Sequence, residues 1–123
     1  MQKVKCIRFM KEESPVIDYV EKNEPEFEEV GIDILASSLC NTSELRSFRG
    51  CYKNGYGTTY PMLPGEPGHE AVGRIVSLGD GVTELKINDM VAMTGHGGDP
   101  CHRSYVIRKE KDIALLNPDT TIP

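Results

Sequence analysis

Three side chains with metal-binding chemistry, Cys40, His69 and Glu70, are the most informative residues of this sequence. Thiolate, imidazole and carboxylate groups all bind zinc, and catalytic zinc sites use three protein ligands with one position left for water or substrate. His69 and Glu70 are adjacent, whereas Cys40 lies far upstream. Such loose spacing is weak evidence by itself, because a buried cysteine, a capped histidine and a surface glutamate would give the same pattern. Both interpretations stay open at this point.

The segment around His69 also contains the backbone that would carry such a site. Residues 68–82 read GHEAVGRIVSLGDGV, with Gly73 and Gly79 inside a run rich in Val and Ile. Glycines in a strand sequence indicate a close approach to other backbone. We therefore expect a strand over 69–78, followed by a turn at 79–81.

Alternation of apolar and polar residues predicts further short strands over 4–10, 16–20, 28–40, 90–93, 104–108 and 113–116. A short helix is expected over 42–48, with Thr42 or Ser43 as its N-cap. The glycines and prolines of 50–68 predict a long loop. About seven short strands and one small helix favour a mainly β fold, a curled antiparallel sheet or barrel that leaves few exposed edges.

The composition limits the classes of function. A chain of 123 residues is long enough for one domain with a modest core. The net charge of -5 and the lack of a Lys/Arg cluster argue against nucleic acid or a membrane surface as partner. No stretch approaches the roughly 20 apolar residues that span a bilayer, and residues 1–14 do not have the pattern of a signal peptide. A cytoplasmic location is therefore expected, with Cys6 and Cys51 as reduced packing residues.

The run GHEAVGRIVSLGDGV resembles the signature of zinc-containing alcohol dehydrogenases, in the medium-chain dehydrogenase/reductase superfamily. Every signature position is matched, by Gly68, His69, Glu70, Gly73, Gly79 and Val82. Segments 38–42, 60–70, 85–91 and 104–106 resemble the same family, with Asn88 in place of a glycine. The resemblance implies that residues 1–123 form a GroES-like catalytic domain, a partly open β-barrel with one or two short helices.

The resemblance also implies roles for the matching residues. Cys40 and His69 would be catalytic zinc ligands, and Glu70 would sit beside the metal as an alternate ligand. Thr42 would contact the oxygen of a small-molecule alcohol and begin a proton relay. Zinc lowers the pKa of a bound hydroxyl group. In a full-length parent enzyme, hydride would then pass to NAD or NADP.

Several departures from the family pattern affect these expectations. Ser43 stands where the family often has an Asp that orients the histidine ligand, and Leu45 stands near its relay histidine. Region 95–101 has one cysteine where many relatives have four, so no structural zinc is expected. The sequence has no GxGxxG between a strand and a helix. The Rossmann domain and a third zinc ligand are thus expected outside this chain, which alone should bind zinc weakly and lack dehydrogenase activity.

Two other classes of protein share the expected fold. A stand-alone GroES-like binding or assembly module, related to the co-chaperonin, is one alternative, because fold does not fix function. Such a module needs no Cys–His–Glu set. A zinc-free quinone-reductase-like relative is another, and it would need neither Cys40 nor His69.

Residues outside the proposed ligand set have more modest expected roles. His96 and His102 are expected to be loop residues rather than ligands. The loop tyrosines would either line a substrate cleft or cover the core; they are Tyr52, Tyr56 and Tyr60. An uncovered cleft face predicts an exposed apolar patch and self-association or a homo-oligomer.

Overall fold

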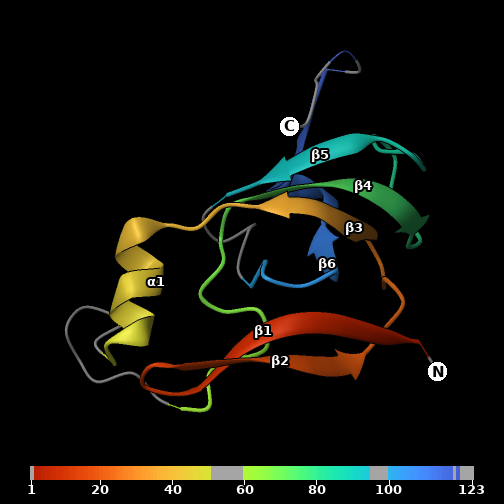
Figure 1. Cartoon of the computed structure of the whole chain (residues 1–123). Coiled ribbons are helices and arrows are strands. Elements are labelled where there is room, and N and C mark those ends of the chain that lie inside the picture. The colour runs from red at the N-terminus through yellow and green to blue at the C-terminus, as the bar shows by residue number, and fades with distance from the viewer. Residues whose placement is uncertain (1, 51–59, 95–99, 118, 120–123) are drawn as a thin grey trace.

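Two antiparallel sheets and one short α-helix make up the architecture of the residues that the structure describes (Figure 1). The computed structural model describes residues 2–50, 60–94, 100–117 and 119. Strands β1 (Lys3–Lys11) and β2 (Ser14–Glu21) form a hairpin. The second sheet has the order β6-β3-β4-β5-β7. Its strands are β3 (Glu29–Ser37), β4 (Ala71–Leu78), β5 (Met90–Met93), β6 (Tyr105–Lys109) and β7 (Ala114–Leu115).

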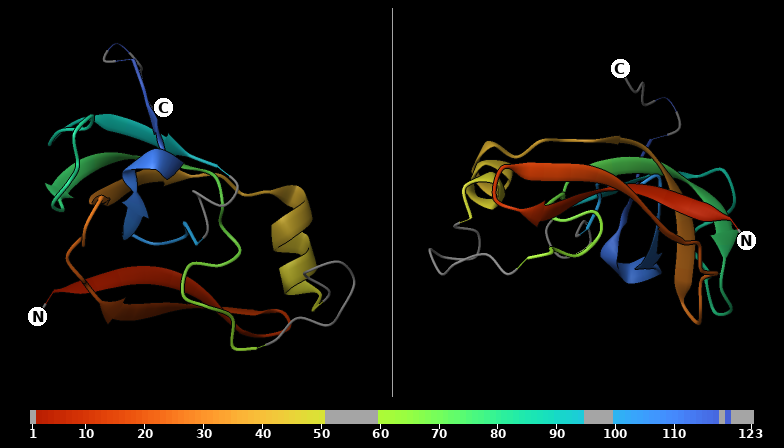
Figure 2. Two further views of the ribbon diagram at one scale, coloured as in Figure 1. Left: turned by 180° about the vertical axis from the view of Figure 1, so that it is seen from behind. Right: turned by 60° about the horizontal axis from the view of Figure 1, so that its bottom comes forward.

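The two sheets face each other without closing into a complete barrel (Figure 2). Helix α1 (Asn41–Phe48) stands at one end of the gap between them, and a 3-10 turn, η2 (Glu110–Asp112), precedes β7. The expected mainly β, partly open fold is therefore confirmed. All strand pairs of the described residues are antiparallel, so this part of the chain contains no parallel βαβ unit.

Helix α1 begins earlier than the sequence predicts. Cys40 is its N-cap residue, in extended conformation and without a side-chain cap hydrogen bond. The prediction that Thr42 or Ser43 caps the helix is wrong, because both residues already lie in its first turn. The N–H of Glu44 donates to the Cys40 carbonyl at 3.0 Å and closes that turn. Within the described ranges, no helix combines the length and the hydropathy that crossing a bilayer requires.

The apolar core is built on the larger sheet. Its fully buried members include Val30, Ile32 and Ile75. The motif glycines serve this packing: a Cβ on Gly73 would lie 2.5 Å from the Asp33 carbonyl oxygen. Strand β4 begins at residue 71 rather than 69. His69 and Glu70 therefore precede the strand, and their side chains are partly exposed and do not pack in the core.

A short segment, residues 101–104, joins the hairpin to the rest of the molecule. The N–H of Ile7 donates to the His102 carbonyl at 2.9 Å, and the N–H of Ser104 donates to the Lys5 carbonyl at 2.8 Å. On its other side, the Ile34 N–H donates to the Ser104 carbonyl at 3.0 Å. The segment thus runs between the two sheets, close to the end of the gap that α1 occupies.

Candidate metal centre

The three predicted ligands converge in space. Ligand atoms of Cys40, His69 and Glu70 all lie within 4.8 Å of one another. Cys40 comes from the start of α1, and the other two residues come from just before β4. The N–H of Ser38 donates to the Glu70 carbonyl at 2.8 Å and ties these two segments together. A backbone hydrogen bond between segments distant in sequence therefore brings the thiol to the His–Glu pair.

The orientation of the His69 ring suits a metal ligand. Nδ1 lies 3.3 Å from the Pro67 carbonyl oxygen, which only accepts hydrogen bonds, so the geometry assigns the proton to Nδ1. Metal-binding histidines commonly donate their second ring N–H to such a carbonyl. Nε2 then faces Glu70 Oε1 at 3.1 Å. A nitrogen lone pair and a carboxylate oxygen at this distance repel each other unless a proton or a cation lies between them.

The donor set also fits zinc in spacing and exposure. Two ligands bonded to one tetrahedral zinc at about 2.1 Å lie roughly 3.4 Å apart, close to the 3.1 Å that separates His69 and Glu70. Their side chains are 23% and 45% exposed, so a further ligand from outside can reach the cluster. The residues present therefore fit a zinc ion, and their role as ligands stays a prediction.

The other residues that the sequence suggests for the site lie outside this cluster or outside the described part of the chain. Thr42 lies in the first turn of α1 with an exposed side chain, and the catalytic roles of Thr42 and Glu70 stay predictions. The Tyr60 hydroxyl donates to the Ser47 carbonyl and so holds its loop against α1. The remaining candidates lie outside the described residues; they are Cys51, Tyr52, Tyr56 and His96.

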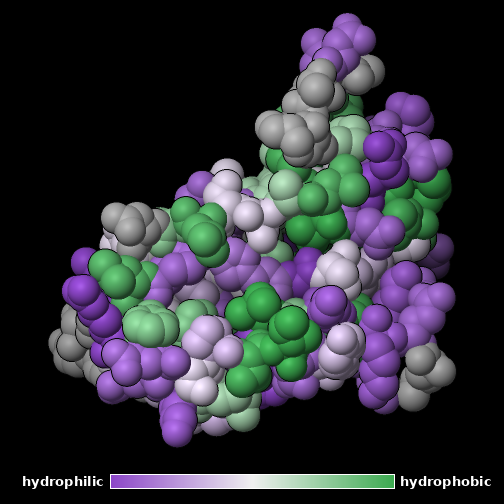
Figure 3. All heavy atoms as spheres, viewed as in Figure 1, coloured by the Kyte–Doolittle hydropathy of each residue, from purple (hydrophilic) through white to green (hydrophobic). Residues whose placement is uncertain are grey.

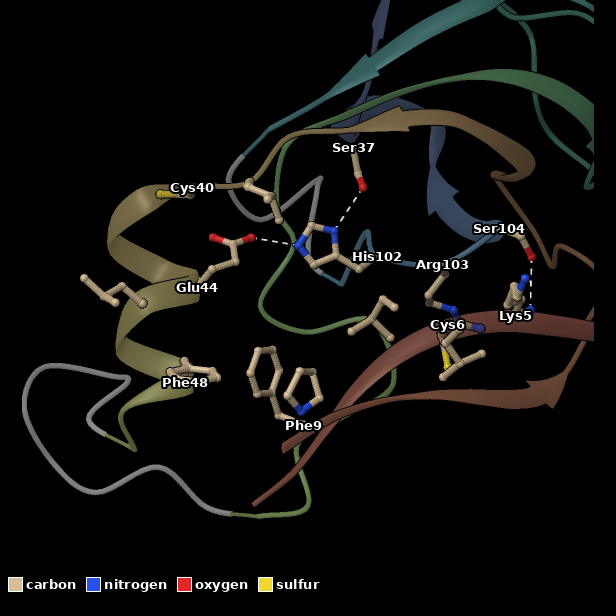
Figure 4. Close-up of a pocket in the computed structure, with 15 residues that line it drawn as sticks. Lys5, Cys6, Phe9, Ser37, Cys40, Glu44, Phe48, His102, Arg103 and Ser104 are labelled. Carbon is tan, nitrogen blue, oxygen red and sulfur yellow. Dashed lines mark hydrogen bonds and ion pairs between the residues drawn. The ribbon is translucent and has the colours of Figure 1, made fainter. Parts of the chain in front are cut away.

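A second His–Glu pair, which the sequence did not indicate, lies beside α1, the helix that begins at Cys40 (Figure 4). His102 Nε2 lies 2.7 Å from Glu44 Oε1, and Nδ1 lies 2.9 Å from Ser37 Oγ. The side chains of His102 and Glu44 are only 8% and 16% exposed. His102 precedes β6, as expected of a loop residue, but it is buried and paired. Because the partners are 58 residues apart, no local pattern predicts the pair. The only sequence sign was the neighbouring Cys101, because cysteine is among the most often buried residue types.

A cavity of about 940 Å³ lies between α1, the hairpin and segment 101–104. Apolar side chains form most of its wall, which also includes Cys40, Glu44 and His102. At this wall, burial raises the pKa of the Cys6 thiol and lowers the pKa of the Arg103 guanidinium, because both charged forms lose hydration.

Large apolar side chains are exposed around the same cavity. Leu39 is 79% exposed and Ile17 is 59% exposed. Figure 3 shows apolar surface over the helix and over the hairpin, on the face seen in Figure 1. An exposed apolar face was expected, and self-association through it stays a prediction.

Residues 26–116 match the family described as the alcohol dehydrogenase GroES-like domain. Alcohol dehydrogenase of Malus domestica is 36% identical over 106 residues, a region that covers 85% of this chain and 26% of that enzyme. The chain thus spans about a quarter of the length of this relative.

Solved structures share the fold at low sequence identity. The 2R,3R-butanediol dehydrogenase of Bacillus subtilis has a TM-score of 0.73 and 19% identity, covering 96% of this chain and 42% of that one. The quinone oxidoreductase of Coxiella burnetii has a TM-score of 0.75 and 19% identity, covering 98% and 39%. These two likenesses concern the fold alone, while the sequence match over most of its length shows that this chain belongs to the alcohol dehydrogenase GroES-like domain family.

Proposed function

We propose that residues 1–123 are the catalytic domain of a zinc-dependent, NAD(P)-linked dehydrogenase that acts on an alcohol or polyol. The observation that carries this proposal is the convergence of Cys40, His69 and Glu70 within 4.8 Å. Membership of the alcohol dehydrogenase GroES-like family supports the reaction class. The nicotinamide site would belong to a Rossmann domain outside these residues, since the described strands pair only in antiparallel fashion.

Each residue has a defined task in this proposal. Cys40 and His69 would hold the zinc ion, with Glu70 as the alternate ligand beside it. When bound, zinc would act as a Lewis acid that makes a substrate hydroxyl group more acidic. The Pro67 carbonyl would keep the proton of His69 on Nδ1, so that the lone pair of Nε2 would bind the metal. Thr42, exposed in the first turn of α1, would accept the substrate proton and pass it to water.

Metal analysis of the purified chain tests this proposal. After loading with Zn²⁺ and dialysis, we expect the wild-type chain to retain more zinc than Cys40→Ala or His69→Ala. Cys6→Ala is the matched control, because Cys6 is a buried thiol outside the cluster. Equal zinc retention in all four proteins would contradict the assignment of the ligands. The reaction class is tested separately, by NAD(P)-linked alcohol turnover in a full-length protein that contains these residues.

A zinc-free, quinone-reductase-like protein is the alternative, and the fold shared with the Coxiella burnetii quinone oxidoreductase is compatible with it without favouring it over the zinc enzyme. In that case the Cys–His–Glu convergence would have no metal to bind. Retention of no zinc by the wild-type chain would favour this alternative. A ring of many subunits in sedimentation would instead favour the stand-alone assembly module.

A further inference from the structure

We propose that His102 is the positioning residue of the metal centre, holding the segment that carries Cys40 and the segment that carries His69 in fixed register. This inference rests on the proposed zinc function for its consequence, but the contacts that support it are independent of any metal. His102 lies between the hairpin, the end of β3, the start of α1 and the loop before β4. It is thus in contact with every element that carries a predicted ligand.

The His102 ring contacts the Cys40 segment on both sides of the cysteine. Ser37, three residues before Cys40, meets His102 Nδ1 at 2.9 Å. Glu44, four residues after Cys40, meets Nε2 at 2.7 Å. The start of the helix, with Cys40 as its N-cap, is therefore fixed at two points that flank the thiol.

The His69 segment is held by the backbone and by close packing. The His102 N–H donates to the Gly65 carbonyl at 3.0 Å, and the Cys101 N–H donates to the Gly68 carbonyl at 2.8 Å. A Cβ on Gly68 would lie 2.7 Å from both Cγ and Nδ1 of His102. The ring therefore rests directly on the backbone next to His69. A side chain at position 68 of this chain would therefore collide with the His102 ring.

The chemistry of the pair makes His102 hard to replace. An ionised carboxylate only accepts hydrogen bonds, so Nε2–H donates to Glu44, and in the neutral ring Nδ1 accepts from the Ser37 hydroxyl. The other carboxylate oxygen, Glu44 Oε2, is buried without a hydrogen-bond partner in the described part of the chain. Glu44 therefore depends on His102, and losing the ring would leave a buried carboxylate unpaired. Because both ring nitrogens are engaged, His102 would act through the ligands rather than as one.

The first experiment measures Co²⁺ affinity by competition with a chelator, together with the thiolate-to-cobalt charge-transfer band. His102→Phe keeps the ring volume and removes both side-chain hydrogen bonds. We expect it to weaken Co²⁺ binding by about 10- to 100-fold, the usual effect of removing a group that orients metal ligands. His102→Gln, whose amide can both donate and accept, should recover much of the affinity. Ser104→Ala is the matched control in the same segment and should bind like wild type.

The second experiment needs no metal. Amide hydrogen exchange of the metal-free protein reports the Ser38 N–H, which donates to the Glu70 carbonyl and joins the two segments. We expect His102→Phe to lower protection at Ser38 far more than at Ile75, which lies in the core of the larger sheet. Equal loss of protection at both amides would show a general structural role and overturn the proposal.

The two failures are distinguishable. If the wild-type chain binds no Co²⁺, the zinc function fails, and selective loss of protection at Ser38 still supports the positioning role. If wild type and His102→Phe bind Co²⁺ equally well, the positioning role is overturned and the zinc site stands. Weaker binding without rescue by His102→Gln, combined with uniform loss of protection, also overturns it.

Discussion

Two histidine–carboxylate pairs lie close together in this molecule, and they differ in almost every other respect. His69 and Glu70 are sequence neighbours, partly exposed, 3.1 Å apart and beside a thiol. His102 and Glu44 are 58 residues apart, nearly buried, 2.7 Å apart and beside a hydroxyl group. The same two side-chain types are therefore placed in environments that favour different roles.

The difference shows how environment sets the role of a chemical group. In the exposed pair, the Pro67 carbonyl engages one ring nitrogen and the other faces a carboxylate oxygen, an arrangement that suits a cation between them. In the buried pair, both nitrogens of His102 have partners within the fold. The first pair is partly exposed and lies beside a thiol, as a binding site requires, whereas the second is enclosed by the fold, as a structural junction requires.

The largest expected effect is the loss of Zn²⁺ affinity when a residue of the exposed pair is replaced. His69→Ala should weaken Zn²⁺ binding by at least about 100-fold, or roughly 2.7 kcal/mol, because it removes a ligand outright. The unfolding free energy of the metal-free protein should change by less than about 1 kcal/mol, since the side chain is partly exposed. Chelator competition and urea unfolding measure the two quantities. Unchanged Zn²⁺ affinity would remove the distinction between the pairs.

The next largest effect is the loss of folding stability when the carboxylate of the buried pair is removed. Glu44→Ala should lower the unfolding free energy of the metal-free protein by about 2 kcal/mol, because the buried Nε2–H of His102 loses its acceptor. Glu70→Ala should cost at most about 0.5 kcal/mol, as expected for an exposed pair. Urea unfolding of both variants under identical conditions is the measurement. Equal losses would mean that the two pairs do not differ in structural role.

A smaller effect on stability is expected at Asn88, a position of the family pattern that shapes the backbone and is not a proposed metal ligand. Asn88 stands at a glycine position of that pattern and has a φ of 75°, in the left-handed region. Asn88→Ala should destabilise the protein by about 1 kcal/mol, because a Cβ without a local hydrogen-bonding group disfavours that conformation. Asn88→Gly should be close to neutral, and neither change should alter Zn²⁺ affinity. Thermal unfolding and zinc retention check both points.

The smallest effect concerns a carboxylate outside both pairs. The pKa of Glu110 lies below its usual value because the carboxylate accepts the N–H of Glu84, and also those of Leu85 and Thr83. Since the folded-state pKa is lowered, the stabilisation is present above the unfolded pKa and is lost as the pH falls through the folded value. Glu110→Gln should therefore flatten the acid side of the stability profile slightly. An unchanged slope below about pH 4.5 would contradict this.

Much of the molecule follows from local sequence. The alternating pattern predicts the strands, and the motif glycines predict the close approach of β4 to its neighbours, as at Gly73. The ends of elements are less accurate: β4 begins after Glu70, and α1 begins before Thr42. These ends depend on hydrogen bonds between distant segments, such as that of Ser38 with Glu70, which short-range patterns do not contain.

The sequence by itself determined the family, the mainly β fold and the identity of three candidate ligands, because residue types and their spacing carry that information directly. Only the tertiary structure decided that Cys40 reaches His69 and that His102 is buried against Glu44. The physical reason is that burial and pairing are properties of the folded environment. His69 and His102 have the same side chain and therefore differ only in the partners and the exposure that the surrounding fold gives to their rings.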